Sequence, residues 1–309
     1  AFSRMSLPQS GIGGFSITDE SGFTYHYTLP VYNKKEMTRS LATSTTGSTG
    51  YAVLNDNPYA TSWLLTGVTG PDFVDRGTSG FIDDQDWGYW VKFDYGKFAK
   101  DYYWRNPYYS FNQSKSMTSN GTTDYISATT GIKETYYLDR VSTRTHSALF
   151  VKSLKTDGKS YYETDSLGPL FEVVTPRPSS SLKLDDIYVI HNKDYETLIS
   201  TGSGGYSLSK DNTDSEELDL KNGDKYDNIY DNYDFEVGVT NSPIQAFLSA
   251  NQLQRIHFNY NYSLCKSTWN SFNFSDGIPA YDAGSYIFPS STNMKGKLTL
   301  RSVEIKGKG

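Results

Sequence analysis

The stretch VDRGTSGFIDDQDWG, residues 74–88, gathers the side chains of this chain that are best suited to chemistry. Its four aspartates surround a Gly-Thr-Ser-Gly turn, and aromatic residues follow them. Carboxylates this close together suit a hard cation such as Ca²⁺, or an acid–base pair that cleaves a glycosidic bond. A solvated acidic turn between two strands is the third interpretation.

The spacing within residues 74–88 fits part of an EF-hand-type calcium loop. Such a loop offers oxygens at positions 1, 3, 5, 7, 9 and 12, with a glycine at position 6 for the sharp turn. Counted from Asp75, the turn glycine falls on Gly80, and the layout resembles the calcium loop of dockerin modules, where position 12 is also Asp. The predicted ligands of a structural Ca²⁺ are Asp75, Ser79, the carbonyl of Phe81, Asp83 and Asp86.

The same stretch departs from that pattern in two respects. Position 3 is Gly77, which has no side-chain oxygen, and no helical pattern flanks the loop. A calcium ion would therefore be held weakly, in a loop that joins strands, and an acidic turn without an ion is the alternative. Catalysis is the poorest explanation, because hydrolysis needs two facing carboxyl groups, one of them with a raised pKa.

No other motif in the sequence assembles a nucleophile, a base and an orienting group. The four histidines have no metal-ligand spacing, and the phosphate-binding and nucleophile-elbow motifs are missing from the sequence. The single cysteine, Cys265, excludes an internal disulfide, and we expect it to be buried as a small apolar residue. The sequence therefore predicts that the chain is not an enzyme.

Aromatic residues suggest a binding surface instead. The run DYYWRNPYYSF, residues 101–111, could stack against sugar rings, and aromatic cover on a broad sheet is the alternative. The residues predicted to bind such a ligand are Trp90, Tyr103, Trp104 and Tyr108.

Composition excludes some classes of partner. The formal net charge is −6 and no stripe of Lys and Arg stands out, which argues against nucleic acid. No apolar run approaches the length of a membrane span. Aromatic residues make up 15% of the chain, and 26 of them are tyrosines, so a core can be built from aromatic and β-branched side chains.

Strand patterns predict an all-β fold of consecutive antiparallel hairpins in one large curved sheet or shell. Residues 14–32 read as two alternating runs around an Asp-Glu-Ser-Gly turn, and a second pair of runs encloses the acidic stretch 74–88. At most one or two short helices are expected, the candidate being residues 242–256, with Ser242 as N-cap and Pro243 in the first turn.

The chain divides by composition into three parts. We expect a β-rich main body over residues 1–200 and a polar, acidic loop or linker over residues 201–234. Residues 235–309 are then a C-terminal β segment that continues the sheet, and all three parts could form one continuous shell.

Several segments resemble parts of very long secreted proteins of Bacteroidota, especially those of flavobacteria. They include GGFSITDESGFTYHYTLPVY, WLLTGVTGPDFVDRGTSGFIDDQDWGYWVKFDYGKF and GKLTLRSVEIKGKG, and the resemblance covers nearly the whole chain in order. The hairpins G-x-x-Y-x-Y, W-L-L-T-x-V and V-x-F-x-Y-G look like strand units of the Rhs/YD-repeat superfamily, whose members build large β shells.

This resemblance implies a section of a giant protein at the outer cell surface, exported in this phylum often by the type IX secretion system. The expected partners are the remainder of its own polypeptide, the secretion machinery or surface glycans, with no nucleic acid and no membrane span. A glycan-binding adhesin module is the alternative function, followed by an enzyme of glycoside-hydrolase type and by a shell around a toxin encoded elsewhere in the polypeptide.

Overall fold

A single antiparallel sheet of eleven strands dominates the computed structural model, which describes residues 11–44, 47–105, 111–118, 121–159, 180–200, 242–265 and 296–308. The strands are β1 (Phe15–Thr18), β2 (Thr24–Ser44), β3 (Gly47–Asn55), β4 (Tyr59–Thr69), β5 (Trp90–Arg105), β6 (Phe111–Thr118), β7 (Gly121–Ser142), β8 (His146–Lys159), β9 (Ser180–His191), β10 (Gln254–Leu264) and β11 (Lys297–Gly307). Two short helices, α1 (Asn192–Ser200) and α2 (Ser242–Asn251), complete the described elements. The predicted all-β fold is confirmed.

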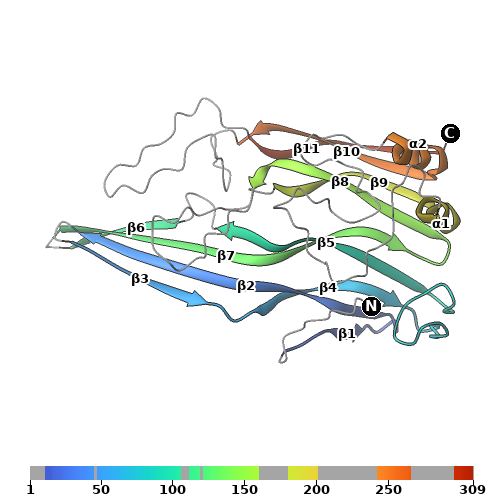
Figure 1. The fold of residues 1–309 in the computed structure, drawn as a ribbon, viewed down its shortest axis with the longest axis horizontal. Coiled ribbons are helices and arrows are strands. Elements are labelled where there is room, and N and C mark those ends of the chain that lie inside the picture. The colour runs from blue at the N-terminus through green and yellow to red at the C-terminus, as the bar shows by residue number, and fades with distance from the viewer. Residues whose placement is uncertain are drawn as a thin grey trace.

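Nine of the strands follow one path across the sheet, in the order β1-β2-β4-β5-β7-β8-β9-β10-β11. The remaining two, β3 and β6, pair with the far ends of β2 and β7, which are 21 and 22 residues long. Since β2 and β7 also pair with each other there, the order β3-β2-β7-β6 forms an arm that projects from the body (Figure 1). Two long hairpins lying side by side therefore interrupt the simple consecutive order.

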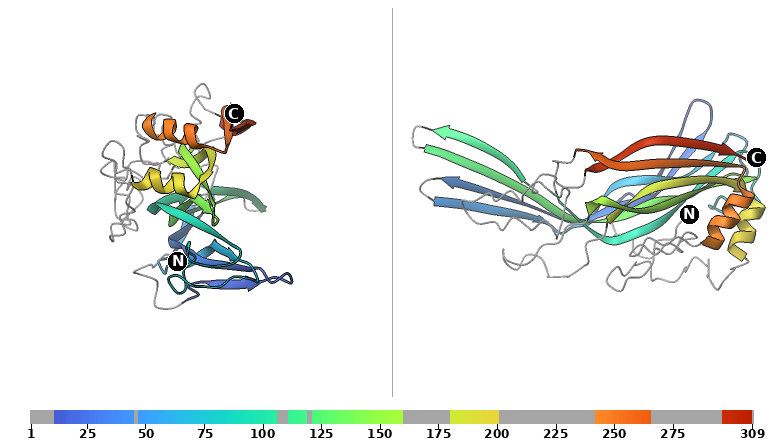
Figure 2. Two further views of the ribbon diagram at one scale, coloured as in Figure 1. Left: turned by 90° about the vertical axis from the view of Figure 1, so that its right-hand side faces the viewer. Right: turned by 90° about the horizontal axis from the view of Figure 1, so that it is seen from above.

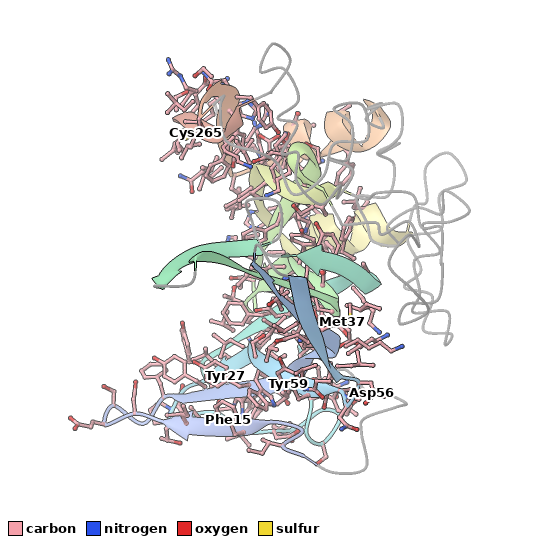
Figure 3. All side chains as sticks on the ribbon, turned by 90° about the vertical axis from the view of Figure 1, so that its left-hand side faces the viewer. Phe15, Tyr27, Met37, Asp56, Tyr59 and Cys265 are labelled. Atoms are coloured by element: carbon pink, nitrogen blue, oxygen red, sulfur yellow. The ribbon has the colours of Figure 1, made fainter. Side chains whose placement is uncertain are left out.

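The predicted hairpin over residues 14–32 is confirmed as β1 paired with β2. Its turn is held by Asp19, whose carboxylate accepts hydrogen bonds from the N–H groups of Ser21 and Phe23 at 2.9 and 3.0 Å. The rings of Phe15 and Tyr27 stack across the hairpin with centroids 5.2 Å apart (Figure 3). Direct cross-strand pairs of this kind stabilise antiparallel strands and fix their register.

Both helices pack on the same face of the sheet (Figure 2, left). Leu198 of α1 and Leu248 of α2 join Leu149, Tyr188 and Ile190 of β8 and β9 in one buried cluster. A second cluster lies farther along the sheet and consists of Phe98, Ala99, Tyr102 and Leu182.

The short helix expected within residues 242–256 is confirmed, and it ends before that stretch does. Helix α2 begins at Ser242 and stops at Asn251, and β10 begins at Gln254. The reason is the period-two pattern of QRIHF, which places Ile256 opposite Ile187 of β9.

The C-terminal hairpin belongs to the same sheet as the first part of the chain, because β10 pairs with β9. The expected linker, residues 201–234, lies outside the described residues. Cys265, at the end of β10, was expected to be buried, and this is wrong, since it is exposed at the opposite end of the molecule from Phe15 (Figure 3).

Candidate functional site

The acidic stretch 74–88, hereafter the Asp86 loop, connects β4 to β5 at one end of the sheet. Its neck is closed by backbone hydrogen bonds between Val74 and Trp87, at 3.0 Å in one direction and 3.1 Å in the other. Ile82 lies against Gly67 of β4, where an added Cβ would meet the Ile82 side chain at 2.4 Å. The loop is therefore folded back onto the same face of the sheet as the helices.

Asp86 organises the loop from its centre, with 0% of its surface exposed. One carboxylate oxygen accepts the N–H groups of Arg76 and Gly77 at 2.9 and 3.1 Å, and the other accepts the N–H of Asp83 at 2.9 Å. Burial by itself raises the pKa of Asp86, but these three donors and the charge of Arg144 lower the pKa overall. Asp86 is therefore a carboxylate at neutral pH, fixed by the backbone that surrounds it.

Asp83 and Asp75 act on the loop backbone in the same manner. Asp83 accepts the N–H groups of Thr78 and Gln85 at 2.8 and 2.9 Å, and Asp75 accepts the N–H of Gly80 at 2.8 Å. A Cβ on Gly77 would lie 2.1 Å from the Asp83 carboxylate. The glycine that breaks the calcium pattern is thus the residue that makes room for Asp83.

All five predicted calcium ligands lie in this one loop, but the structure does not arrange them as a cation site. Ser79 is exposed, and the N–H of Phe81 donates to the carbonyl of Thr78 at 2.9 Å. Within the described ranges, no group of three His, Cys, Asp or Glu side chains is arranged to hold a metal ion. Calcium binding at this loop stays a prediction.

Arg144, in the turn between β7 and β8, ties the Asp86 loop to the body. Its guanidinium donates a hydrogen bond to the backbone carbonyl of Asp86. Arg76 lies over the ring of Trp87 at 4.0 Å from the centroid, and Trp87 and Tyr89 are among the most exposed aromatic side chains of the described residues. Trp87 of the loop and the adjoining Tyr89 therefore face outward, whereas Asp86 is the buried carboxylate at the centre of the loop.

The four aromatic residues predicted to bind a ligand do not form one exposed platform. Trp90 is 4% exposed, so its predicted role in surface stacking is wrong. Trp104 is half-buried, with its indole N–H directed to Asn33 at 3.4 Å. The backbone of Tyr103 is part of β5, and its side chain is outside the described part of the structure. Tyr108 lies outside the described residues.

A second polar cluster, centred on buried Asp186 of β9, was missed by the sequence interpretation. Its carboxylate lies 2.7 Å from Nε of Arg255 and 2.8 Å from Nδ1 of His257. The hydrogen bond to Asp186 raises the pKa of Arg255, whose guanidinium also lies 5.3 Å from the ring centroid of Tyr188. The detectable signal was the Arg-x-His spacing, since residues two apart in a strand share a face.

The Asp186 cluster has the acid–histidine pair of many hydrolases, but the described residues supply no nucleophile to it. Nucleophilic catalysis requires a hydroxyl or thiol hydrogen-bonded to the histidine. Among the described residues, the polar contacts of the His257 ring are Asp186 and Arg255. The contacts of Arg255 and His257 give the buried carboxylate of Asp186 its hydrogen-bond partners and join β9 to β10.

Comparisons with protein-family models, with curated proteins and with solved structures find no match to this chain. Neither described helix has the length and apolar character that crossing a membrane requires.

Proposed function

We propose that this chain is a non-enzymatic scaffold section of a large extracellular bacterial protein, of the Rhs/YD-like kind that its hairpins resemble. In this role it extends a sheet that is shared with the rest of the polypeptide at the outer cell surface. The observation that supports the proposal best is the state of the two edge strands.

Among the described strands, β1 pairs only with β2 and β11 only with β10. Unpaired edges are usually shortened, charged or covered, because an open edge templates further pairing. Strand β11 is 11 residues long and leaves Leu300, Val303 and Ile305 exposed. An edge of this length and composition suits continuation of the sheet by another segment of the polypeptide.

The polar clusters also support a scaffold. The carboxylates of Asp86 and Asp186 accept hydrogen bonds from groups of the same chain. Those of Asp86 hold its own loop together, and those of Asp186 join segments about 70 residues apart in sequence. Such networks stabilise and specify a fold when each member has a partner.

Hydrogen–deuterium exchange tests the proposal on this chain and on a longer polypeptide that contains it. We expect the outward N–H groups of β11 to exchange rapidly in the isolated chain and to become protected in the longer polypeptide. The inner strand β8 is the control, because it is paired on both sides in either form. Equal exchange of β11 in both proteins would contradict the proposal.

A glycan-binding module is the second candidate, supported by the outward rings of Trp87 and Tyr89, which are 55% and 48% exposed. A glycan array tests it with the wild type, Trp87→Ala and Trp104→Ala. Loss of binding in Trp87→Ala would assign the sugar to the Asp86 loop, and loss in Trp104→Ala would assign it to β5. A wild type that binds no glycan excludes this candidate.

A further inference from the structure

The face of the sheet opposite the helices carries a continuous apolar row, hereafter the apolar stripe. The row begins at one edge of the sheet with Ile17, Tyr25, Val68 and Val91, which are directly opposite one another on neighbouring strands. It then passes along β5 to Phe93, two residues beyond Val91 and on the same face. From there it reaches the other edge by the same two kinds of step, between opposite residues and between residues two apart. These further members are Phe93, Val141, Ala148, Phe150, Ile187, Val189, Ile256, Phe258, Val303 and Ile305.

Burial separates the two faces of the same strands. Every member of the apolar stripe is half-buried or exposed, and Ile17, Val303 and Ile305 are 53%, 45% and 64% exposed. Among the alternate residues, which lie on the face of the helices and the Asp86 loop, those at the centre of the sheet are buried even where they are polar, as Ser142 and Ser147 are. The more apolar face of the sheet is therefore the one that α1, α2 and the Asp86 loop leave open (Figure 2).

The size of the stripe is comparable with the apolar part of a protein interface. Nine strands spaced about 4.8 Å apart span about 40 Å, and one or two side chains per strand give a width of about 5–10 Å, hence about 200–400 Å². A standard interface covers about 800 Å² on each partner, of which slightly more than half is apolar. Contiguous apolar patches of a few hundred Å² on soluble proteins are often functional.

Charge and shape favour a second copy of the same chain as the occupant. The stripe contains no charged residue, so two chains of net charge −6 can meet there without placing like charges opposite each other. Two sheets that pack face to face keep their strands within about 30° of one another. A stripe that runs straight across the strands can therefore pack on the same stripe of a second chain related by a two-fold axis, which is the arrangement of an isologous interface.

We infer that the apolar stripe is a homodimer interface, on which two copies of this chain pack their open faces together as a two-sheet sandwich. The stripe includes side chains of the edge strands, Ile17 of β1 and Val303 and Ile305 of β11. A dimer would use these side chains on one face, whereas continuation of the sheet would use the backbone N–H and C=O groups along the edges, so the two can coexist. Failure of one therefore leaves the other standing.

Sedimentation velocity tests the inference with three proteins, all carrying Cys265→Ser so that the exposed cysteine cannot cross-link them. We expect the otherwise wild-type chain to sediment at twice its 34.7 kDa mass within the micromolar range. The double variant Val303→Glu/Ile305→Glu places two charges in the stripe at exposed positions of an edge strand. We expect it to weaken dimerisation at least tenfold and to keep the β-type circular dichroism of the parent.

Lys306→Glu is the matched control, because it changes the net charge by the same two units at the adjacent, exposed residue on the other face of β11. It should dimerise as the parent does. Equal dimerisation of the double variant and the control would overturn the inference. A parent that stays monomeric at about 100 μM, well above the dissociation constants of standard-size interfaces, would overturn it as well, even if an apolar dye bound to the stripe.

If the double variant unfolds, single cysteines supply a second measurement. Spin labels at Ala148→Cys and at Val68→Cys, each in the Cys265→Ser background, should show inter-chain dipolar coupling in the dimer. A label at Lys306→Cys, on the far face, should couple much more weakly. Coupling that is strongest at Lys306→Cys would place the interface on the wrong face and overturn the inference.

Discussion

At the scale of residues, the carboxylates of the Asp86 loop serve as internal caps for backbone N–H groups. Asp86 collects three such donors, Asp83 two and Asp75 one. An EF-hand-type loop and a carboxylate-capped loop both need aspartates around a glycine turn, so their sequence patterns overlap. Which way the carboxylate oxygens point is decided by backbone geometry, and a position count cannot supply that.

Replacing the central carboxylate should destabilise the protein. Asp86→Asn presents an amide NH₂ group to backbone donors, so buried N–H groups lose their acceptor, at a cost of about 1–3 kcal/mol in the free energy of unfolding. Urea denaturation at pH 7 measures this cost. Asp84→Asn is the matched control, because Asp84 is exposed and should change the stability by less than about 0.5 kcal/mol.

The stability difference between the wild type and Asp86→Asn should depend on pH. Because the pKa of folded Asp86 lies below its usual value, its contribution is fully present above about pH 4 and is lost as the pH falls through the folded pKa. The difference in unfolding free energy between the wild type and Asp86→Asn should therefore shrink in acid. A difference that is equally large at pH 2 and at pH 7 would contradict the assigned role of the charge.

Calcium binding can be tested against the same geometry. A cation would have to draw the carboxylates away from their N–H donors, so we expect affinity no tighter than the 10⁻⁴–10⁻³ M range of weak extracellular sites. Calorimetric titration of the wild type beside Asp75→Ala measures it. Micromolar binding that Asp75→Ala abolishes would mean that the loop rearranges around the ion.

At the scale of elements, strand patterns were readable from the sequence and strand neighbours were not. Alternation and turn residues predicted the β1–β2 hairpin and the start of α2 at Ser242. The pairing of β2 with β7 joins residues about 90 positions apart, for example Thr38 with Thr129, and no local signal indicates it. Helix α1 was missed because its nine residues follow a strand without a break.

Gly131 of β7 marks the place where three strands approach most closely. An added Cβ would lie 2.6 Å from the carbonyl oxygen of Lys35 in β2 and 2.7 Å from the indole of Trp104 in β5. We expect Gly131→Ala to lower the free energy of unfolding by about 1–3 kcal/mol, because overpacking there shifts backbone and ring together.

Gly307→Ala is the control for that substitution, since an added Cβ would meet no atom within 4 Å and the residue is also in a strand. Its thermal midpoint should match that of the wild type within a few degrees. If both alanine variants lost the same stability, intrinsic strand propensity rather than the contact between β2, β5 and β7 would be the cause.

At the scale of the whole molecule, the sheet is broad and its layers are unequal. The two helices lie on one face (Figure 2, left), where Ile82 of the Asp86 loop also meets Gly67, whereas the registers place the apolar stripe on the other face. Sequence alternation assigns residues to two faces, but it cannot tell which face the helices cover, because both faces carry apolar side chains. The difference between the two faces depends on the registers of all nine strands together, which no local stretch of sequence specifies.

The arm and the single sheet predict an elongated particle. Strand β7 alone, at 22 residues, spans about 70 Å when extended at about 3.3 Å per residue. A compact chain of 309 residues has a radius of gyration of about 19 Å, and we expect a clearly larger value from small-angle X-ray scattering. The Val303→Glu/Ile305→Glu variant is the appropriate sample, because dimerisation would otherwise enlarge the particle, and a concentration series verifies that it is monomeric. A radius at or below that of the compact chain would mean that the arm folds back onto the body, against the pairing of β2 with β7 as one extended ladder.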